Sequence, residues 1–246
     1  MDHRHHPAGR GGGGLRPGSR ISADPLLRLK EESKIQNPKS KILTPLAILL
    51  SGRGSNFLAL HAAIERGEIP ARIVLVLSNA AEAPGLAKAR ELGLPAVVIP
   101  HKGEPGRRAH EEKVIAALRE SGAEWICLAG YMRLLSPDFV AAFRRRILNI
   151  HPSLLPAFSG LDAQEQALAH GVKVSGCTVH LVDEGLDSGP IVVQRTVPVL
   201  DGDTAATLSA RILEAEHQAY PEALRRLLAE PWTIGGRRLS FGPPSV

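Results

Sequence analysis

The stretch Asn149-Ile150-His151-Pro152-Ser153-Leu154-Leu155-Pro156 joins an apolar strand to an abrupt turn. Side chains alternate between the two faces of a strand, so Asn149 and His151 are predicted to point to the same side. Pro152 has no backbone N–H and disfavours helical angles at the preceding residue, so the strand must end here. We therefore expect an amide and an imidazole at the end of a strand, facing one pocket.

A second stretch, Leu186-Asp187-Ser188-Gly189-Pro190, places a carboxylate among turn-forming residues. A carboxylate beside an imidazole favours the imidazolium and fixes the orientation of the ring. We therefore predict that Asn149, His151 and Asp187 form a catalytic acid/base set.

Around these stretches, apolar runs of strand length alternate with helical patterns. Predicted strands occupy residues 46–50, 73–77, 96–99, 125–129 and 147–150. This alternation is typical of an α/β domain with a mostly parallel sheet and helices on both faces. Residues 174–182 and 191–199 instead alternate like an antiparallel pair. The predicted fold class is thus Rossmann-like α/β with an antiparallel C-terminal addition.

The C-terminal part is predicted to be mainly helical. Thr204 is expected to cap a long amphipathic helix that runs through Leu228. Gly235-Gly236 is interpreted as a turn in a short tail.

The first predicted strand leads into Ser51-Gly52-Arg53-Gly54-Ser55-Asn56 and then a helical pattern. The glycines allow close backbone approach, Ser55 or Asn56 is predicted to cap the helix, and its first amides favour a phosphate. Phe57 stands where a dinucleotide-binding loop has its third glycine, and the second strand ends at Leu77-Ser78-Asn79 without the acidic residue that binds ribose, so NAD is disfavoured. A tight turn without a ligand remains the alternative for this loop alone.

The fourth predicted strand is followed by Gly130-Tyr131-Met132-Arg133-Leu134-Leu135. Ligands in open α/β sheets bind beyond the carboxyl ends of the strands, so this segment is predicted to line an apolar slot for a flat heterocycle. Ordinary core packing is the alternative interpretation of Met132, Leu134 and Leu135.

The glycine-rich loop, the Asn149–Pro156 stretch and the Leu186–Pro190 stretch together resemble the phosphoribosylglycinamide formyltransferase family. These motifs occur in the family's order within roughly residues 45–238, and jointly they are far more specific than any single glycine-rich turn. The resemblance implies formyl transfer from 10-formyltetrahydrofolate, the co-substrate, to the amine of 5'-phosphoribosylglycinamide in de novo purine biosynthesis. It implies no metal.

The resemblance also implies roles for individual residues. It assigns the substrate phosphate to Gly54, Ser55 and Asn56, the sugar to Glu216, and the folate to Arg107, Met132, Arg133, Leu134, Leu135 and Asn149. From the residues alone, Arg107 could equally be a solvated surface charge, Glu216 is better interpreted as a carboxylate on a helix surface, and His180 is interpreted as a core or wall histidine rather than a catalyst. Ser159 and Asp162 depart from the proline and histidine expected there, so a substrate contact at Asp162 stays open.

Two related enzymes and one binding protein are the alternatives. Methionyl-tRNA formyltransferase and formyltetrahydrofolate hydrolase share the Asn, His and Asp set. We expect neither, because the residues after Leu228 and the Gly-rich beginning of the chain supply neither additional domain. A non-catalytic folate or phosphate binder would keep the loops but lose the Asn, His and Asp set, and this chain retains all three of these residues.

Net charge is concentrated at the beginning of the chain. The formal charge of +5 arises in residues 1–44, which contain nine Lys and Arg against four Asp and Glu, whereas the remainder holds 21 of each sign. This basic, Gly-rich segment lacks apolar periodicity, so we predict a disordered extension at 1–44 and a catalytic domain with a short tail at 45–246. No nucleic-acid partner is predicted for the balanced remainder.

No membrane partner is predicted either. The apolar run of residues 42–50 contains Pro45, is too short to span a bilayer, and lies too far from Met1 for a signal peptide. We predict a cytoplasmic protein that binds small molecules as a monomer or a homodimer.

Overall fold

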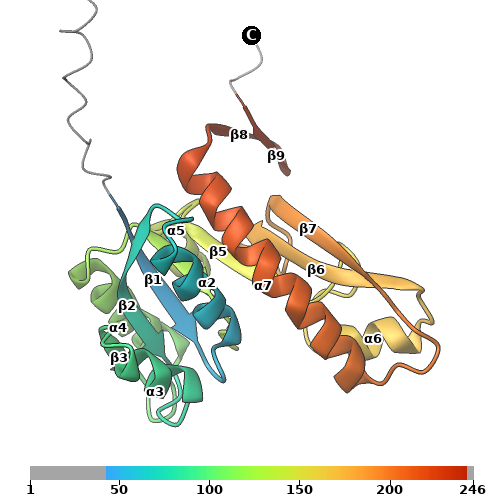
Figure 1. Cartoon of the computed structure of the whole chain (residues 1–246). Coiled ribbons are helices and arrows are strands. Elements are labelled where there is room, and N and C mark those ends of the chain that lie inside the picture. Colours follow the sequence, from blue (N-terminus) through green and yellow to red (C-terminus); the bar gives the residue numbers. More distant parts are fainter. Residues whose placement is uncertain (1–42, 243–246) are drawn as a thin grey trace, which may run out of the picture. The chain divides into compact units, whose positions relative to one another are not determined.

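The computed structural model describes residues 43–242, so most of the predicted 1–44 extension lies outside the described residues. Their strands form one sheet in the order β3-β2-β1-β4-β5-β6-β7-β9-β8 (Figure 1). The strands are β1 (Thr44–Leu50), β2 (Ala71–Ser78), β3 (Ala96–Val98), β4 (Trp125–Leu128), β5 (Ile147–His151), β6 (Val174–Leu181), β7 (Ile191–Pro198), β8 (Trp232–Gly235) and β9 (Arg238–Phe241). Strands β1 to β5 pair in parallel, whereas β6 pairs antiparallel with both β5 and β7. The predicted mixed sheet is confirmed.

Helices pack on both faces of this sheet, as predicted. They are α2 (Ser55–Glu65), α3 (Pro84–Glu91), α4 (Arg107–Glu120), α5 (Pro137–Ala142), α6 (Ala163–Ala169) and α7 (Ala205–Ala229). In β1, Ile48 belongs to one apolar cluster with residues of α2, α3 and α7, and its neighbour Leu49 belongs to a second cluster with residues of α4 and α5. Because both faces are covered, the central strands read as continuous apolar runs.

The long helix α7 is held at its start by the predicted cap. The Thr204 side chain accepts a hydrogen bond from the Thr207 backbone N–H, and the Thr207 side chain accepts one from Thr204 N–H, forming a capping box. Pro221 lies inside the helix and lacks an N–H, yet the helix continues to Ala229. Its buried side contributes much of the first apolar cluster.

One helix start differs from the prediction. Helix α2 has Gly54 as its N-cap and no side-chain cap, because Ser55 and Asn56 already lie in the first turn. The cap predicted for Ser55 or Asn56 is therefore wrong. Asp162 occupies the N-cap of α6 with a φ of 55°, but its side chain makes no capping hydrogen bond.

The tail makes a turn after Gly235, where one was predicted, but the strands on either side of the turn were not predicted: β8 and β9 form a hairpin that extends the sheet. The hairpin pairs with β7 at Ile191 and Arg238. The Trp232 indole N–H donates to the Leu227 carbonyl at 3.0 Å, and the Arg226 guanidinium lies 3.8 Å from the centre of the Phe241 ring. Tertiary contacts with α7 thus stabilise strands that are too short to give a clear apolar pattern.

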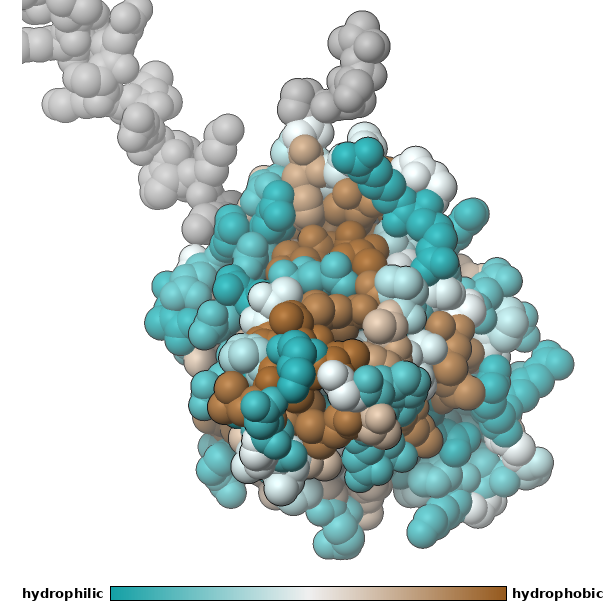
Figure 2. Space-filling view, turned by 90° about the vertical axis from the view of Figure 1, so that its right-hand side faces the viewer, coloured by the Kyte–Doolittle hydropathy of each residue, from teal (hydrophilic) through white to brown (hydrophobic). Residues whose placement is uncertain are grey.

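The surface mixes polar and apolar side chains. Figure 2 shows the face on the β7 side, where apolar side chains gather near the centre and polar ones surround them. Among residues 43–242, no helix combines the length and the apolar character that crossing a membrane requires.

Candidate active site

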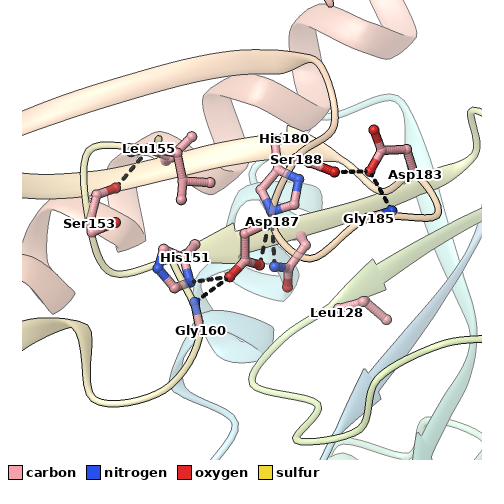
Figure 3. Close-up of polar contacts among 12 residues, drawn as sticks. Leu128, His151, Ser153, Leu155, Gly160, His180, Asp183, Gly185, Asp187 and Ser188 are labelled. Atoms are coloured by element: carbon pink, nitrogen blue, oxygen red, sulfur yellow. Dashed lines mark hydrogen bonds and ion pairs between the residues drawn. The ribbon is translucent and has the colours of Figure 1, made fainter. Parts of the chain in front are cut away.

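The three predicted catalytic residues lie together: Asn149 and His151 belong to β5, and Asp187 lies in the β6–β7 connection. Figure 3 shows His151 beside Asp187, with His180 on the other side of the carboxylate. In the antiparallel pairing of β5 with β6, Asn149 lies opposite His180 and His151 opposite Thr178. The β6–β7 connection folds back so tightly that a Cβ at Gly189 would lie 1.8 Å from the Leu181 carbonyl oxygen. This close approach requires glycine.

Both ring nitrogens of His151 face oxygen atoms. The Nδ1 atom lies 3.4 Å from Asp187 Oδ2, and the Nε2 atom lies 2.8 Å from the Phe158 carbonyl oxygen. The Gly160 N–H donates to the same Asp187 oxygen at 2.9 Å. His151 is buried, and two acceptors suit an imidazolium, which has two N–H donors. The backbone after Pro156 therefore contacts both members of the pair.

His180 fixes the orientation of the Asn149 amide. Its Nδ1 lies 3.0 Å from the Leu181 carbonyl, which only accepts, so Nδ1 carries the hydrogen and Nε2 accepts from Asn149 Nδ2 at 3.1 Å. Burial lowers the pKa of His180, which favours this neutral form. The 3.8 Å separation between Nε2 and Asp187 Oδ1 is therefore not an ion pair.

The interpretation of His180 as a wall histidine captured its burial but missed this contact. The signal that could have revealed it is the strand register, because His180 lies directly opposite Asn149. Within residues 43–242, no group of three or more His, Cys, Asp or Glu side chains is placed to hold a metal ion.

We expect His180 to weaken the folded state in mild acid. Its pKa is lowered from 6.5 by burial, so below that pH the unfolded chain binds a proton that folded His180 does not. The free energy of unfolding, measured by urea denaturation, should therefore fall less between about pH 7.5 and about pH 5.5 in His180→Gln than in the parent. Equal falls in the two proteins would contradict this assignment.

The predicted substrate residues of α2 and α7 contact each other. Asn56 Nδ2 donates to Glu216 Oε2 at 2.7 Å, and both side chains are buried. Burial raises the pKa of Glu216, while the hydrogen bond from Asn56 opposes that shift. Glu216 is therefore not the solvated surface carboxylate of the alternative interpretation.

Gly54 is required for packing as well as for its conformation. It has a φ of 73°, and a Cβ at this position would lie 2.9 Å from the Gly85 Cα at the start of α3. The Gly85 N–H also donates to the Gly52 carbonyl at 3.0 Å. The loop after β1 thus lies directly against α3, a constraint that sequence reasoning did not detect.

The segment after β4 is not ordinary core. Met132 and Leu134 are 69% and 63% exposed, whereas Leu135 is partly buried against the second apolar cluster. Arg133 is partly exposed. Arg107 begins α4, and its Nε lies 3.5 Å from Glu111 Oε1. Exposed apolar side chains at the end of a central strand fit a ligand-binding loop.

Comparisons with known proteins agree with this geometry. The formyl transferase family matches residues 44–224. A phosphoribosylglycinamide formyltransferase of Bacillus subtilis is 40% identical over 182 residues, which cover 74% of this chain and 93% of that protein. A trifunctional purine biosynthetic protein of Drosophila pseudoobscura pseudoobscura is 47% identical over 200 residues, which cover 80% of this chain. The chain spans only 14% of that relative's length.

Solved structures give the same result. The crystal structure of glycinamide ribonucleotide transformylase 1 from Symbiobacterium toebii superposes with a TM-score of 0.79 at 47% identity, covering 81% of this chain and 94% of that one. A formyltetrahydrofolate deformylase from Pseudomonas syringae has a TM-score of 0.76 but is 24% identical, so that likeness concerns the fold alone. The chain belongs to the formyl transferase family, and the resemblance to phosphoribosylglycinamide formyltransferases predicted from its sequence is confirmed.

Proposed function

We propose that the protein transfers the formyl group of 10-formyltetrahydrofolate to the amine of 5'-phosphoribosylglycinamide. The products are 5'-phosphoribosyl-N-formylglycinamide and tetrahydrofolate. The observation that carries the proposal is the order β1-β4-β5 in the sheet, with all three strands parallel. Their carboxyl ends share one edge, so the glycine-rich loop, the apolar segment and the His151 turn meet there.

The chemistry requires stabilisation of a tetrahedral oxyanion. The amine nitrogen bonds to the formyl carbon, and the carbonyl electron pair moves onto oxygen. Asn149 has a second amide hydrogen beyond the one donated to His180, and His151 can exchange its contact with the Phe158 carbonyl for the oxyanion. Such donors typically contribute about 3 kcal/mol each to transition-state stabilisation.

Collapse of this intermediate completes the transfer. The bond between the formyl carbon and the folate nitrogen breaks, and a proton from the amine must reach that leaving nitrogen. Asp187 holds His151 from the side of Nδ1, so the opposite nitrogen is the one available for the reacting atoms.

The phosphorylated substrate fits the β1–α2 loop and α7. The first amides of α2 have no side-chain cap and can donate to phosphate oxygens. Among the described residues, Asn56 Oδ1 is buried without a hydrogen-bond partner and can accept from a sugar hydroxyl beside Glu216. Gly54, Ser55 and Asn56 are accordingly proposed as the phosphate site, and Glu216 as the sugar contact.

The folate is proposed to bind the segment after β4. Met132, Arg133, Leu134 and Leu135 would contact its ring system through side chains and free backbone groups, with Asn149 at the transferred group. Arg107 lies at the start of α4 and is proposed to contact the more distant part of the co-substrate. Neither role requires a metal ion.

The test is the release of tetrahydrofolate from 10-formyltetrahydrofolate with and without phosphoribosylglycinamide. We expect release only when the amine is present, because the site is built to bind a phosphorylated acceptor. His151→Asn is the control for contaminating activity. Release at the same rate without the amine would instead indicate a formyltetrahydrofolate hydrolase, and binding of both compounds without release would indicate a non-catalytic binder.

A further inference from the structure

The segment Met132–Leu135 is here called the 132–135 loop. Its apolar side chains Met132 and Leu134 are exposed, yet its first residue is hydrogen-bonded to a side chain far away in the sequence. The Met132 backbone N–H donates to Ser51 Oγ at 2.9 Å. Ser51 Oγ donates in turn to Asn79 Oδ1 at 2.6 Å. One hydroxyl group therefore accepts from the loop and donates to the end of β2, two roles that an alanine side chain cannot fill.

Asn79 is itself held in place. It is 6% exposed, and its Nδ2 lies 3.2 Å from His101 Nδ1. Ser51 immediately follows β1 and begins the glycine-rich loop. The Ser51 hydroxyl thus joins the end of β1 to the 132–135 loop, and it lies outside the proposed phosphate site, which begins at Gly54.

At the other end of the 132–135 loop, the next residue, Ser136, is hydrogen-bonded to a buried carboxylate. Glu111 of α4 is 6% exposed. Its Oε1 accepts from the Ser136 backbone N–H at 2.9 Å, and its Oε2 accepts from the Ser136 hydroxyl. A buried carboxylate that accepts both hydrogen bonds from one residue fixes that residue strongly.

Glu111 has a third neighbour, the guanidinium of Arg107, at 3.5 Å. A cation in the first turn of a helix is disfavoured by the helix dipole, so a carboxylate one turn later offsets that cost and orients the arginine. Arg107 and the end of the 132–135 loop are therefore linked through one side chain.

We propose that Ser51 and Glu111 are positioning residues for the folate co-substrate, holding the two ends of the 132–135 loop. Leu135 packs against the second apolar cluster, but Met132 and Leu134 are too exposed for core packing to hold them, so the hydrogen bonds at the two ends of the loop position these residues. Glu111 additionally orients Arg107 toward the co-substrate. This inference rests on the proposed function and adds to it the residues that shape the folate site.

The kinetic test uses Ser51→Ala and Glu111→Gln. We expect each to raise the KM for 10-formyltetrahydrofolate about fivefold or more. Ser51→Ala removes the acceptor of the Met132 N–H, and Glu111→Gln removes the negative charge and one of the two acceptor oxygens that hold Ser136. The KM for phosphoribosylglycinamide and the kcat should each stay within about twofold of the parent. Ser51→Thr keeps the hydroxyl and should restore the parent KM.

Matched controls are available in α4 and at its C-cap residue, Ser121. Ser121→Ala removes a hydroxyl that donates to the Leu118 carbonyl at the far end of the helix. Glu112→Gln changes an exposed carboxylate that pairs with Arg108, next to Glu111 in the sequence. Neither control should change either KM. Equal rises for both substrates in Ser51→Ala or Glu111→Gln would indicate general damage and overturn the proposal.

Amide hydrogen exchange of the free protein separates this inference from the proposed function. Exchange at Met132 should accelerate in Ser51→Ala, and exchange at Ser136 should accelerate in Glu111→Gln, while the β1 and β5 amides keep the parent rates. Unchanged exchange in an active enzyme would overturn the positioning roles alone. A parent protein that transfers no formyl group would overturn the proposed function and, with it, the assignment to folate.

Discussion

Asp187→Asn is expected to lower kcat about 100-fold or more while changing the KM for phosphoribosylglycinamide by less than about twofold. The Asp187 carboxylate lies 3.4 Å from His151 Nδ1 and also accepts from the Gly160 N–H. Asparagine keeps an oxygen for Gly160 but removes the negative charge that supports the imidazolium. The lost interaction matters most when negative charge develops on the substrate, so the transition state is affected more than substrate binding.

The same experiment includes a control and a coupling measurement. The control is Asp183→Asn. Asp183 lies in the same β6–β7 connection and accepts hydrogen bonds from the Gly185 N–H and the Ser188 hydroxyl. This substitution should reduce kcat far less than Asp187→Asn does. His151→Asn should be as damaging as Asp187→Asn. The double variant should lose much less than the product of the two single effects, because the residues act as one unit. Independent, multiplicative losses would argue against this coupling.

Gly54→Val is expected to lower the free energy of unfolding by about 3 kcal/mol or more. A β-branched residue is strained at a φ of 73°, and its Cβ would lie 2.9 Å from the Gly85 Cα, which is backbone and has little room to move. Urea denaturation measures the loss directly. Gly52→Ala is the matched control, because no heavy atom beyond the two neighbouring residues lies within 4 Å of a Cβ at Gly52.

The expected result for Gly54→Val differs from a pure binding defect. Phosphate binding alone would predict a stable variant with a raised KM for the phosphorylated substrate. The contact with Gly85 makes reduced folding stability the first effect, so the KM is informative only if the variant remains folded. A valine variant as stable as the parent would show that α3 shifts to accommodate the side chain.

Local patterns were sufficient to predict most of the fold. The apolar runs placed β1 to β7, and Thr204 marked the start of α7. These features depend on neighbours within a few residues, through periodicity, φ restriction and capping. The β8–β9 hairpin escaped prediction because its short strands are stabilised by α7 and β7 rather than by their own pattern.

The sequence by itself determined that Asn149 and His151 share one side of a strand end and that Asp187 lies in a turn, since both follow from alternation and turn chemistry. Only the tertiary structure decided which side chains from distant parts of the chain contact each other around the site. The contacts of His180 with Asn149, Asn56 with Glu216, Ser51 with Met132 and Glu111 with Ser136 join residues 25 to 160 positions apart. Such contacts depend on strand order, register and helix placement, which no local sequence pattern encodes.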